Sequence, residues 1–254
     1  MTMRIGRCGV VALLLGASLT LAACDGSSSG DGKRPAAVAE ASASPSAPRD
    51  FDVEQALASA NSNPYSAEIK RVTRFDTIGL AVVDGRLNLP GKATGTLTVR
   101  IYDSPISKAS RSRVVLTRTH TYVKVEEGEN AGGWKKGGRQ TGSPLPDLHG
   151  YAELLLAQGP SARKGIDGAA DGVPAQKLSG EIPVGKLEKI DPSLYKMARQ
   201  IGLESFACDV WVDDKGRVLK LVQWAGHSSG GSVTVQTDLS DLDDPVEVEP
   251  PTGN

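Results

Sequence analysis

Apolar and polar side chains alternate with a period of two along the last third of the chain. Every second residue of Phe206–Val212 is apolar or a thiol, and the alternation returns in Arg217–Ala225 and Ser232–Leu239. Because successive side chains of a strand point to opposite faces, each segment predicts a strand with one buried face. Asp213–Gly216 is rich in turn formers, and Gly216 suits the left-handed conformation that ends a three-residue hairpin loop. The region therefore predicts an antiparallel meander of three strands.

The segment Tyr65–Val125 is also rich in β-forming residues, and glycine, proline and aspartate interrupt it. Four strands are predicted there, namely Ser66–Phe75, Leu80–Leu89, Gly95–Tyr102 and Val114–Val125. Turns are predicted at Asp84-Gly85, Pro90-Gly91 and Asp103–Ser110. One more strand is predicted at Val173–Val184, and loops are predicted at Glu126–Ser143 and Gly165–Gly172.

Three short segments instead repeat apolar residues every three to four positions, which is the helical period. The first begins after Asp52, and the second covers Asp147–Gln158. The third has the clearest boundaries, because Asp191 suits the N-cap, Pro192 the first helical turn and Gly202 the C-cap.

About eight sequential strands and three helices indicate an α+β protein with mostly antiparallel pairing. One sheet of that width must curl, and the amphipathic helices need an apolar surface to cover. We therefore expect a curved antiparallel half-barrel with three short helices packed on its concave face.

The first residues have the organisation of a secretory signal. Arg4 and Arg7 precede the apolar segment Val10–Leu21, whose 12 residues are too few to span a bilayer. Leu21–Cys24 resembles the bacterial lipobox, in which the cysteine is diacylated before cleavage in front of it. The sequence predicts a signal peptide over residues 1–23, palmitate-type acylation of Cys24 and anchorage to the extracytoplasmic face of the cell membrane. The alternative is an ordinary signal peptide with a chance cysteine.

The remaining chain divides by composition. Residues 24–50 are rich in Gly, Ser, Ala and Pro and predict a disordered tether after the lipidated cysteine. Residues 51–248 form the predicted half-barrel domain, and residues 249–254 a disordered tail. Cys208 is the one thiol left in that domain, so no disulfide within it can form. We expect this thiol to be buried and unreactive.

Charge argues against a nucleic-acid partner. Without Arg4 and Arg7 the chain has 27 basic and 30 acidic residues, a net charge of −3. The basic residues concentrate in Arg100–Lys124, which either faces anionic headgroups or forms the solvated side of strands.

No arrangement of residues identifies a reaction. The three histidines lack the spacing of metal ligands. The G-x-S-x-G match at Gly26–Gly30 lies in the tether, and the S-x-x-K matches at Ser161 and Ser193 lack their companion motifs. The sequence therefore predicts a protein without enzymatic activity, metal or other cofactor.

Besides the lipobox and the tether, seven short segments of the chain have a characteristic sequence. They are Tyr122–Val125, Trp134–Lys136, Gly172–Gly180, Asp209–Asp213, Gly216–Leu219, Val233–Val235 and Asp244–Pro251. Together they resemble the actinobacterial LppX/LprG-type lipoproteins and, more distantly, the LolA/LolB carriers, from about Arg111 to Pro250. The resemblance implies an open curved sheet over helices, with an apolar cavity that receives acyl chains. It transfers no fixed catalytic or ligand residue.

The predicted wall of such a cavity consists of apolar residues from the two later helical segments and the meander. The candidates are Leu154, Leu155, Leu194, Met197, Ile201, Val210, Val212, Leu219 and Leu221. Each of them fits a closed core equally well.

The predicted function is the binding of lipid acyl chains by a monomeric, membrane-anchored lipoprotein. Transport of lipids or lipoglycans across the envelope is the finer hypothesis. The alternative is a cell-surface lipoprotein with a closed core that binds a protein partner. A catalytic cleft around Ser193 or Asp209 is a third hypothesis.

Overall fold

The computed structural model describes residues 51–60, 63–75, 79–91, 93–103, 109–128, 130–138, 145–168, 173–226 and 231–252. All of them belong to one unit of the chain, Ser46–Asn254. The predicted signal peptide, lipidated Cys24 and tether lie outside the described residues.

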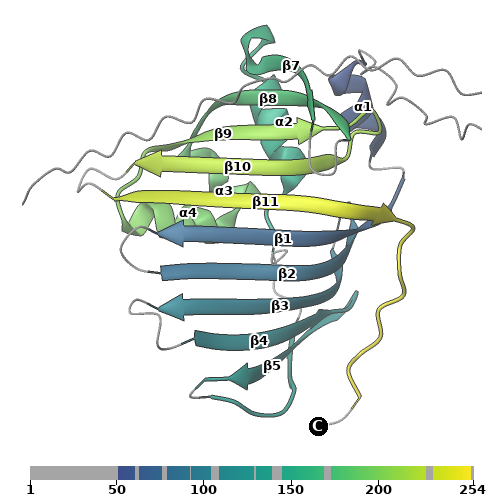
Figure 1. Ribbon diagram of the computed structural model, residues 1–254, viewed down its shortest axis with the longest axis vertical. Coiled ribbons are helices and arrows are strands. Elements are labelled where there is room, and N and C mark those ends of the chain that lie inside the picture. The colour runs from purple at the N-terminus through teal and green to yellow at the C-terminus, as the bar shows by residue number, and fades with distance from the viewer. Residues whose placement is uncertain are drawn as a thin grey trace, which may run out of the picture. The chain divides into compact units, whose positions relative to one another are not determined.

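The strands of the described chain form one antiparallel sheet of eleven strands (Figure 1). The first group of strands comprises β1 (Tyr65–Phe75), β2 (Gly79–Leu89), β3 (Thr94–Asp103), β4 (Ala109–Leu116), β5 (His120–Glu127) and β6 (Lys135–Gly138). The second group comprises β7 (Arg163–Gly168), β8 (Pro174–Pro183), β9 (Ser205–Val212), β10 (Val218–Gly226) and β11 (Ser232–Asp243). Their spatial order is β6-β5-β4-β3-β2-β1-β11-β10-β9-β8-β7.

The two groups meet at a single long seam between β1 and β11. Residues face each other there from Glu68 opposite Ser240 to Phe75 opposite Val233. Each group on its own is a sequential meander, so β1–β11 is the pairing that joins the two halves of the sheet. The sequence-based prediction of a wide, curled, mainly sequential antiparallel sheet is confirmed.

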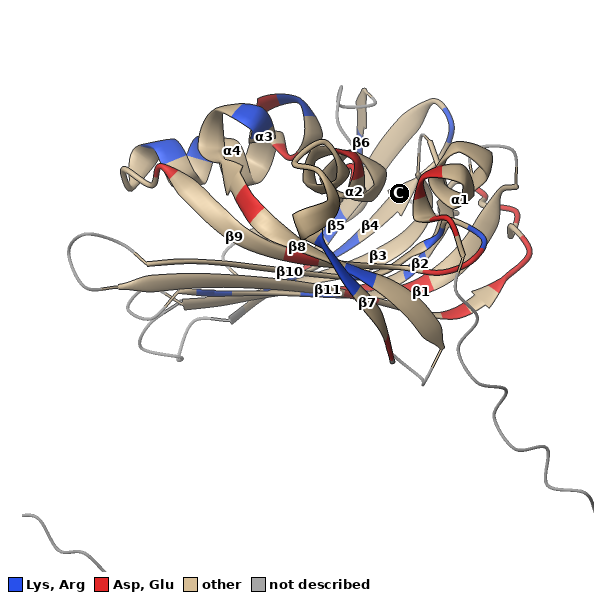
Figure 2. Cartoon of the chain, turned by 90° about the horizontal axis from the view of Figure 1, so that it is seen from above, with Lys and Arg blue, Asp and Glu red and all other residues tan. Residues whose placement is uncertain are grey.

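Four α-helices occur in the described residues, namely α1 (Val53–Ala60), α2 (Leu148–Leu156), α3 (Val184–Ile190) and α4 (Pro192–Gln200). The helices lie on the concave side of the sheet (Figure 2). The predicted caps of the last helix are confirmed, since the Asp191 side chain accepts a hydrogen bond from the Leu194 N–H and Gly202 has a φ of 69°. The prediction of three helices missed α3, because its seven residues bury only Val184 and Leu187 and show little periodicity.

The predicted strand count was also too low. Val114–Val125 is not one strand, because the chain reverses after Leu116 and β5 begins at His120. Strand β6 lies within the predicted loop Glu126–Ser143, and β7 overlaps the predicted loop Gly165–Gly172; both are edge strands with few buried side chains. A short 3₁₀ helix, η1 (Pro160–Ala162), leads into β7.

The predicted turn at Asp84-Gly85 is wrong, because both residues lie within β2. Gly85 pairs with Leu97 on β3 and has a φ of +149°. A Cβ atom added there would lie 2.1 Å from the carbonyl oxygen of Thr96, so glycine marks a close approach of two backbones.

The main core lies between the concave face and the helices. The alternation predicted for β9 is confirmed, since Phe206, Cys208, Val210 and Val212 are all fully buried. Tyr151 and Leu155 of α2 and Leu187 of α3 complete the same core. The half of the sheet under the helices is therefore closed.

The convex face of β2–β5 is polar and carries the basic segment noted in the sequence. Arg100 forms an ion pair with Asp84. Arg111 and Arg113 both lie close to the Glu126 carboxylate, with nitrogen-to-oxygen distances of 3.3 and 3.5 Å. These side chains fit the solvated side of strands, since neighbouring acids balance them.

After β11 the chain continues as a tail along the ends of β1 and β2. The Asn88 side chain both donates to and accepts from the backbone of Val246, with distances of 2.8 Å in each case. Ser66 donates to the carbonyl oxygen of Asp244. These bonds hold the tail as far as Val246.

Candidate functional site

The concave face of β2–β5 is apolar and only partly covered. In the part of the chain that the structure describes, no helix lies behind β3–β5, whereas α2, α3 and α4 lie behind the strands from β8 to β11 (Figure 1). The register places Val83 opposite Val99 in one row of this face, and Val114 opposite Val123 in the neighbouring row. All four are half-buried, and Ile101 next to them is 45% exposed. This half of the concave face thus carries partly exposed apolar side chains, interrupted on β4 by Ser112.

A slot of about 230 Å³ lies at the boundary between the covered and uncovered halves. Leu194 and Met197 of α4 form one wall, and Phe75, Ala81 and Val83 line the other. The slot is apolar along most of its length. It therefore lies between the helix layer and Val83, the one of these valines that lines it.

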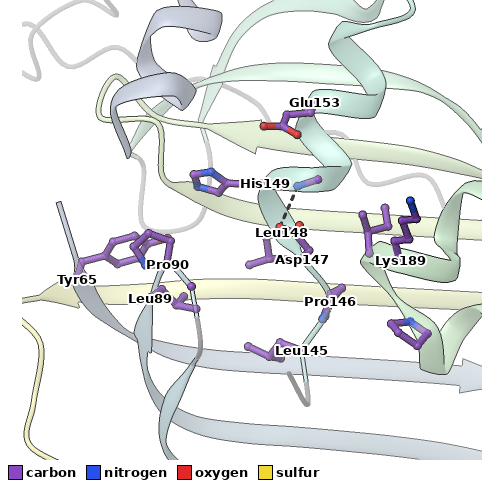
Figure 3. A pocket seen from close by; sticks show the side chains of 14 residues that line it. Tyr65, Leu89, Pro90, Leu145, Pro146, Asp147, Leu148, His149, Glu153 and Lys189 are labelled. Carbon is purple, nitrogen blue, oxygen red and sulfur yellow. Dashed lines mark hydrogen bonds between the residues drawn. The ribbon is translucent and has the colours of Figure 1, made fainter. Parts of the chain in front are cut away.

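A second hollow, of about 400 Å³, lies at the start of α2 (Figure 3). It shares Leu145 and Pro192 with the slot, so the two hollows flank the same pair of residues. Its other lining groups are mixed, with Tyr65 and Leu89 beside His149 and Glu153. Ligand pockets typically have volumes of roughly 300–1,000 Å³, and this hollow falls within that range.

A buried ion pair forms the polar floor beside the slot. Arg71 of β1 donates to Asp191 Oδ2 at 2.9 Å, and both side chains are almost entirely buried. Asp191 also caps α4, because its Oδ1 accepts from the Leu194 N–H at 3.0 Å. The pair thus fixes the start of α4 to the first strand of the sheet.

The network continues under α2. The Tyr151 hydroxyl donates to Asp191 Oδ2 at 3.4 Å and accepts from Gln223 Nε2 at 2.8 Å. Gln223 Oε1 and the hydroxyl of Thr237, which faces Arg71 on the neighbouring strand, have no hydrogen-bond partner among the described residues. Buried polar atoms of this kind are usually satisfied by ordered water or by a ligand.

Burial changes the acidity of several groups around this core. Desolvation, followed by the nearby Asp191 carboxylate, raises the pKa of Tyr151 above its ordinary value. Desolvation also lowers the pKa of His149 in the mixed hollow, so its neutral form is favoured. The same cause raises the pKa of Cys208 to about 12. The prediction of a buried thiol is confirmed, and its raised pKa makes it a poor nucleophile.

Alkaline pH is expected to destabilise the domain through Cys208. The thiol ionises near pH 9 in the unfolded chain but near pH 12 in the fold. Between these values the unfolded state binds fewer protons, so the free energy of unfolding falls by about 1.4 kcal/mol per pH unit for this group. Urea unfolding between pH 8 and 11 measures the slope, which Cys208→Ala should make shallower. An identical slope in Cys208→Ala would contradict this assignment.

The structure distributes the nine predicted wall residues over four environments. Leu194 and Met197 line the slot. Leu154 and Ile201 are half-buried against the core, and the closed core contains Leu155, Val210, Val212 and Leu221. Leu219 lies on the convex face, where it packs with Trp211 and Ala175.

The position of Leu219 has a local cause. The pairing of β10 with β9 shifts register between Val218 and Lys220, so Val218 and Leu221 both point inward. A β-bulge of this kind adds one residue and reverses the alternation that a sequence pattern assumes. The prediction that Leu219 lies on the concave wall is therefore wrong.

The sequence analysis missed the lining residues that β1 and β2 contribute to the slot. The sequence contained a partial signal, because Phe75 and Val83 lie at alternating positions of predicted strands and could have been assigned to one face. Leu80–Val83 is apolar on both faces, however, so the pattern did not show which face points inward.

The positions considered for catalysis have structural explanations. Asp209 forms an ion pair with Lys177 on the convex face at 2.8 Å. Asp213 holds the β9–β10 turn by accepting from the backbone N–H groups of Lys215 and Arg217. Ser193 lies exposed at the start of α4. Across the described ranges, no group of three or more His, Cys, Asp or Glu residues could hold a metal ion.

The open antiparallel sheet with helices along half of its concave face defines an α+β fold. The chain belongs to the LppX_LprAFG lipoprotein family, which it matches over residues 53–248. Members of this family are not known as enzymes, and membership implies a lipid anchor. Among the described residues, no helix is long and apolar enough to cross a membrane.

Solved structures show the same likeness at low sequence identity. The lipoprotein LppX of Mycobacterium tuberculosis is 17% identical, with a TM-score of 0.40, and the match covers 78% of this chain and 96% of that one. A LolA superfamily protein of Nitrosomonas europaea is 9% identical, with a TM-score of 0.27 and coverage of 78% and 96%. No curated protein sequence shows significant similarity to the chain.

Proposed function

We propose that this lipoprotein binds the acyl chains of lipids in the slot and on the uncovered concave face of β2–β5. The observation that carries the proposal is the group of half-buried valines, Val83, Val99, Val114 and Val123, on a face that no described helix covers. A soluble domain rarely leaves a continuous apolar surface open unless something binds there.

The energetics favour a hydrocarbon ligand. Each methylene group removed from water contributes about 0.8 kcal/mol. The slot between α4 and β1–β2 excludes water on two sides, and the valines of the uncovered face extend the apolar contact from there, beginning with Val99 opposite Val83. A chain laid along this path exchanges water for side-chain contacts over its whole length.

The closed half of the sheet limits where the ligand lies. The core under α2 and α3 is solid, since Leu155, Val210 and Val212 have no exposed surface. The proposed site is therefore the open half of the concave face rather than a cavity through the centre. The alternative function, a protein-binding lipoprotein, requires a closed core. Only the half of the sheet beneath the helices has one.

Acylation of Cys24 places this function at the membrane. A diacylated cysteine gives stable anchorage, whereas a single chain gives only marginal binding. The residues between Cys24 and Phe51 then connect the anchor to α1. The anchor keeps the binding face tethered to the membrane from which a lipid is taken or to which it is delivered, so transport of lipids or lipoglycans is the proposed outcome of binding.

Two adjacent valines on opposite faces of β2 provide a matched test. Val83 lines the slot, Val82 lies on the convex face, and both are half-buried. In a Cys24→Ser background, Val83→Asn is expected to reduce the co-purifying lipid roughly 5- to 100-fold, because an unpaired buried amide costs about 1–3 kcal/mol. Val82→Asn should retain the lipid. Mass spectrometry of organic extracts measures both.

Thermal unfolding of the two variants controls for stability, since both substitutions weaken β2 similarly. Equal lipid loss from both variants would contradict the assignment of the concave face. Absence of lipid from the parent protein, together with no transfer of labelled lipid between vesicles, would contradict acyl-chain binding itself.

A further inference from the structure

The slot beside α4 has one polar end. Along β1 its lining changes at every second residue, from Arg71 through Thr73 to Phe75. Asp191 and Ser193, at the start of α4, complete the polar end, and all other side chains that line the slot are apolar. The slot therefore has the same division as an acylated lipid, in which a polar linkage is followed by a hydrocarbon chain.

The Asp191 carboxylate is engaged by the protein itself. Its Oδ1 accepts from the Leu194 N–H. Its Oδ2 accepts from Arg71 Nη2 at 2.9 Å and from the Tyr151 hydroxyl at 3.4 Å. Both oxygens are thus bonded inside the fold, so this carboxylate positions Arg71 rather than a ligand.

Two donors at the polar end have no acceptor in the described part of the chain. The Arg71 guanidinium has more N–H groups than its bond to Asp191 uses, and Asp191 is its one hydrogen-bond partner among the described residues. The Thr73 hydroxyl has no partner among them. Arg71 keeps 11% of its side-chain surface exposed, and it lines the slot. Since the two residues alternate on one face of β1, their Cα atoms lie about 7 Å apart, close enough for both to contact one ligand group.

Charge decides which kind of acceptor suits this end. The charged residues that line the slot are Arg71 and Asp191, which form an ion pair and cancel each other. A carboxylate or phosphate in the slot would add a second negative charge beside the Asp191 carboxylate, and like charges at a buried site repel. The carbonyl oxygen of an ester accepts hydrogen bonds without adding charge. The slot therefore favours a neutral acceptor.

We propose that Arg71 and Thr73 donate hydrogen bonds to the carbonyl oxygen at the head of an esterified acyl chain, so that the slot recognises the linkage and discriminates against free fatty acids. This inference rests on the proposed acyl-chain function and specifies its ligand. The chain continues from the carbonyl toward Phe75 and Met197. The slot holds about 230 Å³, less than the roughly 300–1,000 Å³ of typical ligand pockets, so it takes the linkage and the first part of one chain. The rest of the lipid lies over the valines of the uncovered face.

Three small probes with the same hydrocarbon chain test the assignment. The full chain carrying Cys24→Ser is freed of bound lipid by exchange into detergent and is then titrated with each probe after the detergent is removed. The probes are methyl dodecanoate, dodecyl methyl ether, which lacks the carbonyl oxygen, and sodium dodecanoate, which is charged. Displacement of a bound neutral fluorescent dye measures binding. Methyl dodecanoate is expected to bind about tenfold more tightly than each of the other two, because a hydrogen bond from a charged donor is stronger than one between neutral groups.

Thr73→Val locates the interaction in the slot, because valine has a similar shape but no hydroxyl. Arg71 is less suitable for substitution, since it also holds Asp191 at the start of α4. Thr73→Val is expected to reduce the preference for the ester over the ether about two- to tenfold. Thr234→Val is the matched control, because Thr234 is also half-buried but lies on the convex face of β11, opposite Arg74. It should keep the full preference, and urea unfolding shows whether both variants retain the fold.

The outcomes separate recognition of the linkage from binding of the chain. Preference for the ester that falls in Thr73→Val and not in Thr234→Val supports the proposal. Equal binding of ester and ether, tighter binding of dodecanoate, or any other pattern in the two variants overturns it and leaves acyl-chain binding intact. Failure of all three probes to displace the dye contradicts the proposed function together with this inference.

Discussion

Gly85→Ala is expected to destabilise the domain by more than about 4 kcal/mol, which is an exceptional loss for one methyl group. The added Cβ would lie 2.1 Å from the Thr96 carbonyl oxygen and 2.9 Å from the Leu97 Cα atom. Both contacts are with backbone, so they are relieved only if β2 moves away from β3 and breaks the ladder between them. The φ of +149° adds strain for any residue with a Cβ. Chemical denaturation of the purified protein, or its loss from the soluble fraction, measures the effect.

Gly91→Ala is the matched control, because Gly91 also has a positive φ, of +89°, but a Cβ there meets nothing within 4 Å. This substitution is expected to cost only the backbone strain, about 1–2 kcal/mol. Equal losses at both positions would show that conformation alone, and not the approach of the two strands, requires glycine at Gly85.

Arg71→Met is expected to cost about 3–5 kcal/mol, since it leaves the Asp191 carboxylate buried without its ionic partner. Asp191 has only 3% of its surface exposed, so water cannot replace the guanidinium. The loss should extend to α4, because the same carboxylate caps the helix. Urea unfolding measures the stability, and hydrogen exchange of the α4 amides measures the local effect.

Arg74→Met, on the same strand but exposed on the other face, is expected to change stability by about 0.5 kcal/mol or less. Asp191→Asn combined with Arg71→Met should recover part of the loss, because asparagine still caps a helix and carries no charge. If the double variant is as unstable as the sum of the two single ones, the ion pair does not couple these residues.

Local signals in the sequence identified much of the fold. The turn at Gly216 and the caps at Asp191 and Gly202 depend on neighbouring residues only, so residue type sufficed to find them. The alternation in β9 likewise required one buried face and nothing else. The overall class followed, because sequential strands with few helices leave one wide antiparallel sheet as the compact arrangement.

Features that depend on distant parts of the chain were not visible. Arg71 and Asp191 are separated by 120 positions, and only the fold brings them together. A basic residue at an inward position of a predicted strand was the available signal, since such a charge needs a buried partner. Gly85 was mistaken for a turn residue, because close strand approach and turn formation both favour glycine.

The candidate site was the least predictable part. Leu194 and Met197 line the slot, yet nothing in their sequence pattern distinguishes a slot from a closed core. Which part of the concave face stays uncovered depends on where the helices pack, and this is determined only when the sheet and the helices come together. The bulge at Val218 and Lys220 moved Leu219 to the other face for a similar reason, because it exists only in the pairing of two strands.

The place of β11 constrains the order in which the molecule assembles. This strand is the last of the chain but lies in the middle of the sheet, between β1 and β10. Until β11 pairs with β1, the backbone N–H and C=O groups on that edge of β1 are unpaired, and no hydrogen bonds join the two meanders. A polypeptide made from its amino terminus must therefore be synthesised through β11 before the two halves of the sheet can unite.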